Sequence, residues 1–146
     1  MKSLILFFLI GLSLSYNPED AVTYARKYCK DYNSEYYHYD GVDGANFVSQ
    51  CLKAGGQDFD KCVGVDKKGA IPLLGNLKSC LIQKGWKTRA NSIPKNFKPG
   101  YPFIGPASAM IATKVTNSSI SFCRHSADTC SGRTSKDDYI FFYLPD

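Results

Sequence analysis

The hydrophobic pattern of this chain changes character close to Pro94, and this change constrains the fold more than any other feature. Before Pro94, apolar residues recur at the spacing of amphipathic helices. After it they form short β-rich runs that Gly, Pro, Asn and Ser separate. Helices followed by a series of strands are typical of an α+β domain with an antiparallel sheet, and the sequence predicts that fold class.

Three helices are expected in the first part of the chain. Asn17 can cap a helix that begins at Pro18 and extends to Cys29. A second helix is expected from about Ala45 to Ala54, with one apolar face, and Gly55-Gly56 would end it. A third is expected from Pro72 to Lys84.

Four strands are expected after Pro94, over residues 101–104, 109–115, 120–123 and 139–144. The residues Thr116-Asn117-Ser118 predict a hairpin turn between the second and third of these strands. The same turn contains the N-glycosylation sequon Asn117-Ser118-Ser119, so we expect Asn117 to be the glycosylation site if the host glycosylates.

The first fifteen residues have the features of a secretory signal peptide. Lys2 supplies a positive charge, residues 4–12 form an apolar run too short to span a bilayer, and Ser13 and Ser15 suit cleavage. A buried N-terminal helix is the alternative for this run. We therefore predict a signal peptide over residues 1–15, one domain over residues 16–146 and no membrane span. The destination would be extracellular, or the lumen of the secretory or endolysosomal pathway.

All six cysteines follow this leader. An even number of cysteines in a small exported domain predicts three disulfides, but the sequence does not select their pairing. A zinc site is disfavoured because there is no Cys-x-x-Cys pair and the only histidines, His38 and His125, are far apart in the sequence. We expect no metal and no cofactor. The cysteines are Cys29, Cys51, Cys62, Cys80, Cys123 and Cys130.

The charge pattern argues against nucleic-acid binding. The net charge is +5, spread along the chain, and no basic run alternates with aromatic residues as a stacking platform would require. A modest positive charge suits attraction to anionic surfaces such as bacterial cell walls.

The segment from Asp43 to Gln50 (Asp-Gly-Ala-Asn-Phe-Val-Ser-Gln) resembles the nucleophile motif of the putative amidase-domain family. Those proteins are secreted cysteine hydrolases with a papain-like fold, related to bacterial cell-wall amidases and endopeptidases. Their motif has Asp-Cys-x-Asn-Phe-x-Ser-Gln, and a thiolate there is stabilised by the helix N-terminus. The nucleophile aligns with Gly44, and glycine has no side chain to form a covalent intermediate.

The resemblance extends through most of the chain and implies two further positions. Residues 107–113 are similar to the segment that carries the family's general-base histidine, which aligns with Ser108. Residues 124–128 are similar to a His-Thr-Asn-Asp segment whose histidine, here His125, is implied to orient the base. Gly44, Ser108 and His125 therefore mark vestigial positions, and no catalytic residue is expected.

Ligand binding need not disappear with catalysis, because losing the nucleophile and base leaves ground-state contacts in place. The resemblance implies a groove for cell-wall peptide, peptidoglycan or an extracellular protein. Two alternatives are an active secreted cysteine amidase or peptidase and an extracellular structural protein whose groove is filled. The aromatic stretch 37–40 is either a solvated loop or a ligand-gripping rim. The candidate ligand-binding residues are Asp43, Asn46, Ser49, His125 and Asp128.

Overall fold

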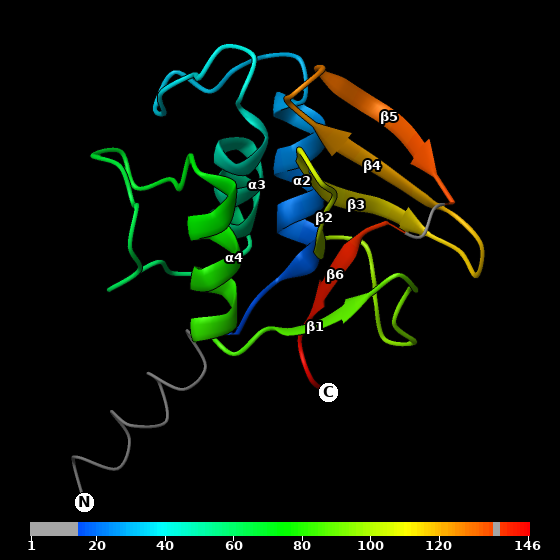
Figure 1. Ribbon diagram of the computed structural model, residues 1–146. Helices are drawn as coiled ribbons and strands as arrows, with labels where there is room; N and C mark the ends of the chain where they lie inside the picture. The colour runs from blue at the N-terminus through cyan, green and yellow to red at the C-terminus, as the bar shows by residue number, and fades with distance from the viewer. Residues whose placement is uncertain (1–14, 136–137) are drawn as a thin grey trace, which may run out of the picture.

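The computed structural model describes residues 15–135 and 138–146, which form three helices and one six-stranded sheet (Figure 1). The predicted signal peptide, apart from Ser15, lies outside the described residues. The helices are α2 (Pro18–Tyr28), α3 (Gly44–Ala54) and α4 (Leu74–Gln83). The strands are β1 (Lys87–Ala90), β2 (Pro102–Ile104), β3 (Ala109–Val115), β4 (Ile120–Arg124), β5 (Thr129–Thr134) and β6 (Ile140–Tyr143).

The sheet is antiparallel throughout, in the order β1-β6-β2-β3-β4-β5. The labelled helices lie together on one side of it, and α2 and α3 pack against β3 and β4 (Figure 1). α4 packs against α3. The predicted α+β class with an antiparallel sheet is confirmed.

Local signals set the ends of the helices. At the start of α2, the side chain of Asn17 accepts a hydrogen bond from the Asp20 amide at 3.2 Å. α3 ends at Ala54, and the amide of its C-cap residue Gly55 donates to the Cys51 carbonyl at 3.1 Å. α4 begins two residues later than predicted, because Leu73 has an extended backbone and is its N-cap.

The four predicted strands are present, and a turn closes the β3–β4 hairpin, where the Thr116 amide donates to the Ser119 carbonyl at 2.9 Å. Asn117 is exposed in this turn. The two edge strands, β1 and β5, were not predicted from the sequence. All four residues of β1 are exposed, and β5 is polar apart from Cys130 and contains Gly132, so neither has the apolar alternation that predicts a strand.

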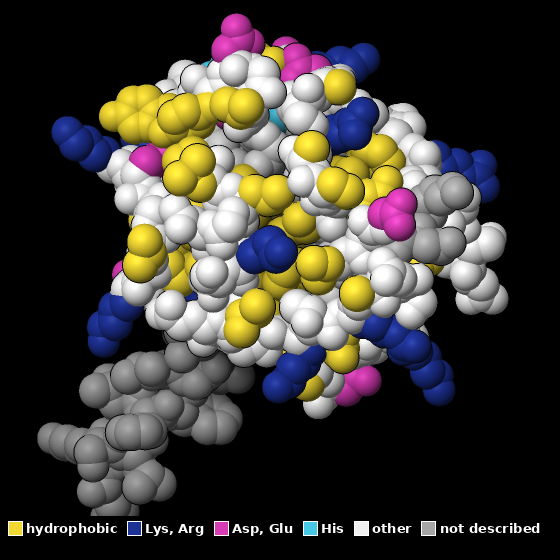
Figure 2. Space-filling model, in the orientation of Figure 1, with side chains coloured by type: hydrophobic (Ala, Val, Ile, Leu, Met, Phe, Trp, Pro, Cys, Tyr) yellow, Lys and Arg dark blue, Asp and Glu magenta, His cyan; other side chains and the backbone are white. Residues whose placement is uncertain are grey.

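The core combines the apolar face of α3 with an aromatic cluster on the sheet. Phe103 lies at the centre of that cluster and contacts the rings of Phe97, Phe122, Tyr139 and Phe141. Figure 2 shows other apolar side chains at several places on the visible face, between charged ones. No helix among the described residues is both long and apolar enough to cross a bilayer.

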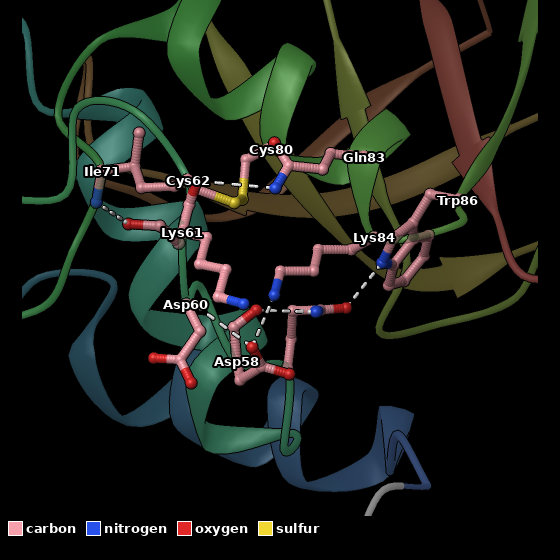
Figure 3. Close-up of a disulfide and its surroundings, with 11 residues drawn as sticks. Asp58, Asp60, Lys61, Cys62, Ile71, Cys80, Gln83, Lys84 and Trp86 are labelled. Carbon is pink, nitrogen blue, oxygen red and sulfur yellow. Dashed lines mark hydrogen bonds and ion pairs between the residues drawn. A yellow bond between two sulfur atoms is a disulfide. The ribbon is translucent and has the colours of Figure 1, made fainter.

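Two disulfides join distant segments. Cys29 at the end of α2 is bonded to Cys130 in β5, with Cα atoms 5.2 Å apart. Cys62, in the long loop before α4, is bonded to Cys80 within that helix (Figure 3). Figure 3 also shows Lys84, whose ammonium lies 2.6 Å from the Asp58 carboxylate. This ion pair is a second link between the C-terminal end of α4 and the loop that contains Cys62.

The prediction of three disulfides is wrong, because Cys51 and Cys123 are free thiols. Both side chains are fully buried, Cys51 in α3 and Cys123 in β4, where a cysteine packs as a small apolar residue. The Cys123 thiol also donates to the Cys130 carbonyl at 3.2 Å. Burial, with a smaller effect of Cys123, raises the pKa of Cys51 well above its usual value, and burial raises the pKa of Cys123 to about 11.

Thiol counting tests this assignment. Denatured, unreduced protein should react with two maleimides per molecule, at Cys51 and Cys123. Native protein should react with almost none, because both thiols are buried and protonated at neutral pH. Full reduction should expose six and serves as the control. Absence of labelling in the denatured, unreduced protein would mean that these two cysteines form a third disulfide.

Candidate functional site

Helix α3 and strand β3 bring Gly44 and Ser108 into contact. Gly44 is the first residue of α3, and Ser108 directly precedes β3. A Cβ atom on Gly44 would lie 3.1 Å from the Ser108 hydroxyl oxygen and 3.3 Å from the Ala109 amide nitrogen. Gly44 and Ser108, which the sequence resemblance predicted to be the former nucleophile and base positions, therefore face each other across the α3–β3 junction.

The neighbour of Ser108 on the β4 side is Ser126, which sequence analysis did not single out. The two hydroxyl oxygens are 2.7 Å apart, within hydrogen-bonding distance. His125, the preceding residue, has its ring nitrogens at the Asp43 carboxylate and the Tyr28 carbonyl instead. No local sequence signal distinguishes Ser126, because its contact depends on the turn that follows β4.

A pocket of about 200 Å³ opens beside Gly44. Val42 and Leu73 form exposed apolar parts of its wall, with 71% and 64% of their surface accessible. The side-chain hydroxyls within it belong to Ser108 and Ser126. The pocket is lined by Gly41, Val42, Gly44 and Ala45, by residues 72–74 and 107–109, and by Ser126.

The N-terminus of α3 lies at this pocket, which Gly44 and Ala45 help to line. The Asp43 side chain makes no capping bond, and the first amide to bond back is that of Phe47, to the Asp43 carbonyl at 2.9 Å. The preceding amides of a helix have no partner within it, and they carry a partial positive charge. The arrangement therefore suits a carbonyl or carboxylate oxygen held between apolar walls.

Three of the candidate ligand-binding residues use their polar atoms inside the protein. Asp43 accepts from the Tyr39 amide at 2.8 Å and from Asn46 at 2.9 Å. Asn46 also donates to the Tyr37 carbonyl at 2.8 Å. Ser49 donates to the Asn46 carbonyl and accepts from the Ile71 amide. These side chains are buried and fix the entry to α3, and none of them lines the pocket.

Asp128 and the aromatic stretch 37–40 lie around His125. Asp128 accepts a hydrogen bond from the Tyr32 hydroxyl. The Tyr32 ring lies over His38, with centroids 3.8 Å apart, and meets His125 edge-on at 4.9 Å. Phe47 stacks on His125 at 3.8 Å. The loop is thus anchored to His125, and its residues 37–40 are not among those that line the pocket.

The pair of Asp43 and His125 is the strongest electrostatic feature of the region. His125 Nδ1 lies 2.5 Å from Asp43 Oδ2, and Nε2 donates to the Tyr28 carbonyl at 2.6 Å. Burial raises the pKa of Asp43, but hydrogen bonds from His125, Tyr39 and Asn46 outweigh it, so the pKa lies below its usual value. The buried His125 ring thus links the Asp43 carboxylate to the Tyr28 carbonyl.

Within the described residues, no group of three or more His, Cys, Asp and Glu side chains is placed to hold a metal ion. The chemistry available around Gly44 consists of hydroxyls, backbone amides and apolar contacts.

Fold and site together define an α+β domain in which the N-terminus of a buried helix meets the start of a central strand. A family model described as a putative amidase domain matches residues 15–99, from the approach to α2 to the segment after β1. The chain belongs to this family. The match includes Gly44, whereas Ser108 and His125 lie beyond it. Comparisons with curated proteins and with solved structures found no match.

Removal of His125 tests the buried pair. His125→Ala should lower the free energy of unfolding by about 2–3 kcal/mol at neutral pH, because it leaves the buried Asp43 carboxylate without the hydrogen bond from His125. His38→Ala is the matched control, since His38 lies farther from Asp43 Oδ2, at 3.5 Å, and is partly exposed. Urea denaturation measures both. Equal losses in the two variants would contradict the role assigned to His125.

The lowered pKa of Asp43 predicts how the free energy of unfolding depends on pH. A carboxyl whose pKa is lower in the folded state stabilises the protein above its unfolded value of about 3.9, and this stabilisation is lost as the pH falls further. The stability difference between wild type and Asp43→Asn should therefore be largest near neutral pH and shrink below about pH 4. A difference that is constant from pH 7 to pH 3 would contradict this assignment.

Proposed function

We propose that this chain is an exported, catalytically inactive member of the putative amidase domain family that binds a peptide in the pocket at the N-terminus of α3. The observation that carries the proposal is the close approach of Gly44 to Ser108, whose hydroxyl oxygen would lie 3.1 Å from a Cβ atom at residue 44. These two residues stand where the family's motif requires a thiol and an imidazole. The contact between Gly44 and Ser108 supports the proposal that the backbone of the family's catalytic site is retained while the thiol and the imidazole are missing.

The remaining cysteines and histidines favour inactivity over an active cysteine amidase. Four of the six cysteines are in disulfides, and the thiols of Cys51 and Cys123 are buried with raised pKa values. A nucleophilic cysteine needs an accessible thiolate. Both histidines of the sequence lie beside Asp43. Ser108 therefore has a serine, rather than a base, as its hydrogen-bonding neighbour.

The open pocket favours a binding protein over a purely structural one. Two hydroxyls and the amides of α3 can hold a peptide carbonyl or a terminal carboxylate, while Val42 and Leu73 can contact apolar side chains. The ligand that we propose is a cell-wall peptide, free or within peptidoglycan, with a segment of an extracellular protein as the second candidate. Disulfides are compatible with export to an oxidising compartment.

A papain-like ancestry is part of the proposal. In that fold a helix carrying the nucleophile precedes an antiparallel sheet carrying the other catalytic groups, and here α3 precedes β3 and β4 in the same way. Gly44, Ser108 and Ser126 would then surround the former reaction centre.

Restoring the missing groups tests the inactivity. Wild type should not cleave amide bonds in peptidoglycan, whereas Gly44→Cys with Ser108→His should create a thiol that reacts with iodoacetamide in the native state. The double variant should react faster, and at lower pH, than Gly44→Cys alone, because a thiolate needs the neighbouring imidazole. Gly75→Cys, an exposed thiol in the first turn of α4, is the matched control. Hydrolysis by the wild type, or equal reactivity in all variants, would contradict the assignment.

Binding is tested by sedimentation with insoluble peptidoglycan and by titration with soluble muropeptides. Wild type should bind, and Leu73→Asp should weaken binding at least about tenfold, because an apolar contact is replaced by a charge. Ile82→Asp is the control, since Ile82 is similarly exposed on α4 and does not line the pocket. Failure of the wild type to bind either material would exclude the cell-wall ligand. An equal effect of both variants would exclude this pocket.

A further inference from the structure

A second cluster of polar side chains lies on the sheet at the β3–β4–β5 end. Lys114 of β3 pairs with Ser121 of β4, and Ser121 pairs with Arg133 of β5. Directly paired residues of antiparallel strands point to the same face of a sheet. One face therefore has a row of cation, hydroxyl and cation across three adjacent strands.

The turn of the β3–β4 hairpin adds two more hydroxyls beside this row. The oxygens of Thr116 Oγ1 and Ser119 Oγ are 2.9 Å apart, and Arg133 Nη2 lies 3.5 Å from Ser119 Oγ. Ser119 is buried, with 8% of its surface accessible. Its hydroxyl is therefore held in place by the turn, and it joins the turn to the guanidinium of β5.

These five residues enclose a cavity of about 110 Å³, lined by Lys114, Thr116, Ser119, Ser121 and Arg133. Every one of these side chains can donate a hydrogen bond, and none carries a negative charge. The volume corresponds to about three or four water molecules, enough for one phosphate or sulfate group.

The charges of the row have no carboxylate partner among the residues that the structure describes. Within residues 15–135 and 138–146, neither Lys114 nor Arg133 forms an ion pair with a carboxylate. Strands lie about 4.8 Å apart, so the two cations originate about 10 Å from each other, and long side chains from both can reach one group above Ser121. Two cations directed at one small cavity repel each other unless an anion lies between them.

We propose that this cavity is a binding site for a tetrahedral oxyanion, a phosphate or sulfate group. Arg133 and Lys114 would supply charge-assisted hydrogen bonds, and the hydroxyls of Ser119 and Ser121 would complete the shell, while Thr116 donates to the Ser119 carbonyl and holds the turn. The site shares no lining residue with the pocket at α3, so it is independent of the proposed peptide binding.

The experiment is an NMR titration of the disulfide-bonded protein with sodium phosphate, sodium sulfate and glycerol 3-phosphate, at ionic strength held constant with sodium chloride. Saturable shifts are expected at the amides of Lys114, Ser119, Ser121 and Arg133. Lys114→Ala and Arg133→Ala should each weaken binding at least about tenfold, because each removes a hydrogen bond to a charged group. Ser121→Ala should weaken it less.

Arg89→Ala is the matched control, because Arg89 is an exposed cation on β1, at the opposite edge of the sheet. It should bind the anions as wild type does. Near-UV circular dichroism checks that each variant keeps its tertiary structure. Tighter binding of glycerol 3-phosphate than of the inorganic anions would identify a phosphate monoester as the preferred ligand, whereas equal binding of all three would identify the tetrahedral anion itself.

Shifts that do not saturate, or that appear equally on addition of sodium chloride, would overturn the proposal. So would a loss of affinity in Arg89→Ala as large as in Arg133→Ala, because it would show that net charge alone attracts the anion.

Discussion

The buried pair of Asp43 and His125 is the interaction on which the rest of the site depends. It joins the loop that enters α3 to the turn after β4, and the second nitrogen of His125 extends the connection to the end of α2 through the Tyr28 carbonyl. A charge in such a position is stable only when its hydrogen bonds are complete. Asp43 meets this condition with bonds from Tyr39, Asn46 and His125, so three segments are held in one relative position.

The same pair explains why the N-terminus of α3 is open. A residue in the N-cap position usually bonds to the first amides of the helix, but the Asp43 carboxylate is directed to His125 and the loop instead. The first turn is then without a side-chain cap, and its residues Gly44 and Ala45 line the pocket together with Val42 and Leu73. In a cysteine hydrolase this arrangement would stabilise a thiolate. The first residue of α3 is Gly44, and the Ser108 hydroxyl beside it is hydrogen-bonded to Ser126.

Features that depend on neighbouring residues in the chain were predicted from the sequence, whereas features that depend on contacts between distant residues were not. The cap at Asn17 and the stop at Gly55 are local signals, and the structure places the helix ends where they predict. The edge strands β1 and β5 were missed because they are defined by pairing to β6 and β4, not by their own composition. The site divides in the same way. The motif resemblance predicted Gly44 and Ser108 as former catalytic positions; the structure brings the two residues together, and their former role is part of the proposal. Ser126, Val42 and Leu73 line the pocket only because separate loops converge there.

The sequence by itself determined the α+β class, the family and the absence of a thiol at residue 44, because each of these is contained in local pattern or residue type. Tertiary structure alone decided which polar side chains face solvent and which cysteines pair. Asp43, Asn46 and Ser49 have the chemistry of ligand-binding residues, but packing of α3 against the sheet turns them into internal hydrogen-bond partners. Likewise Cys51 and Cys123 remain thiols in the core. The physical reason is that burial and pairing depend on contacts between residues distant in the chain, which no local pattern contains.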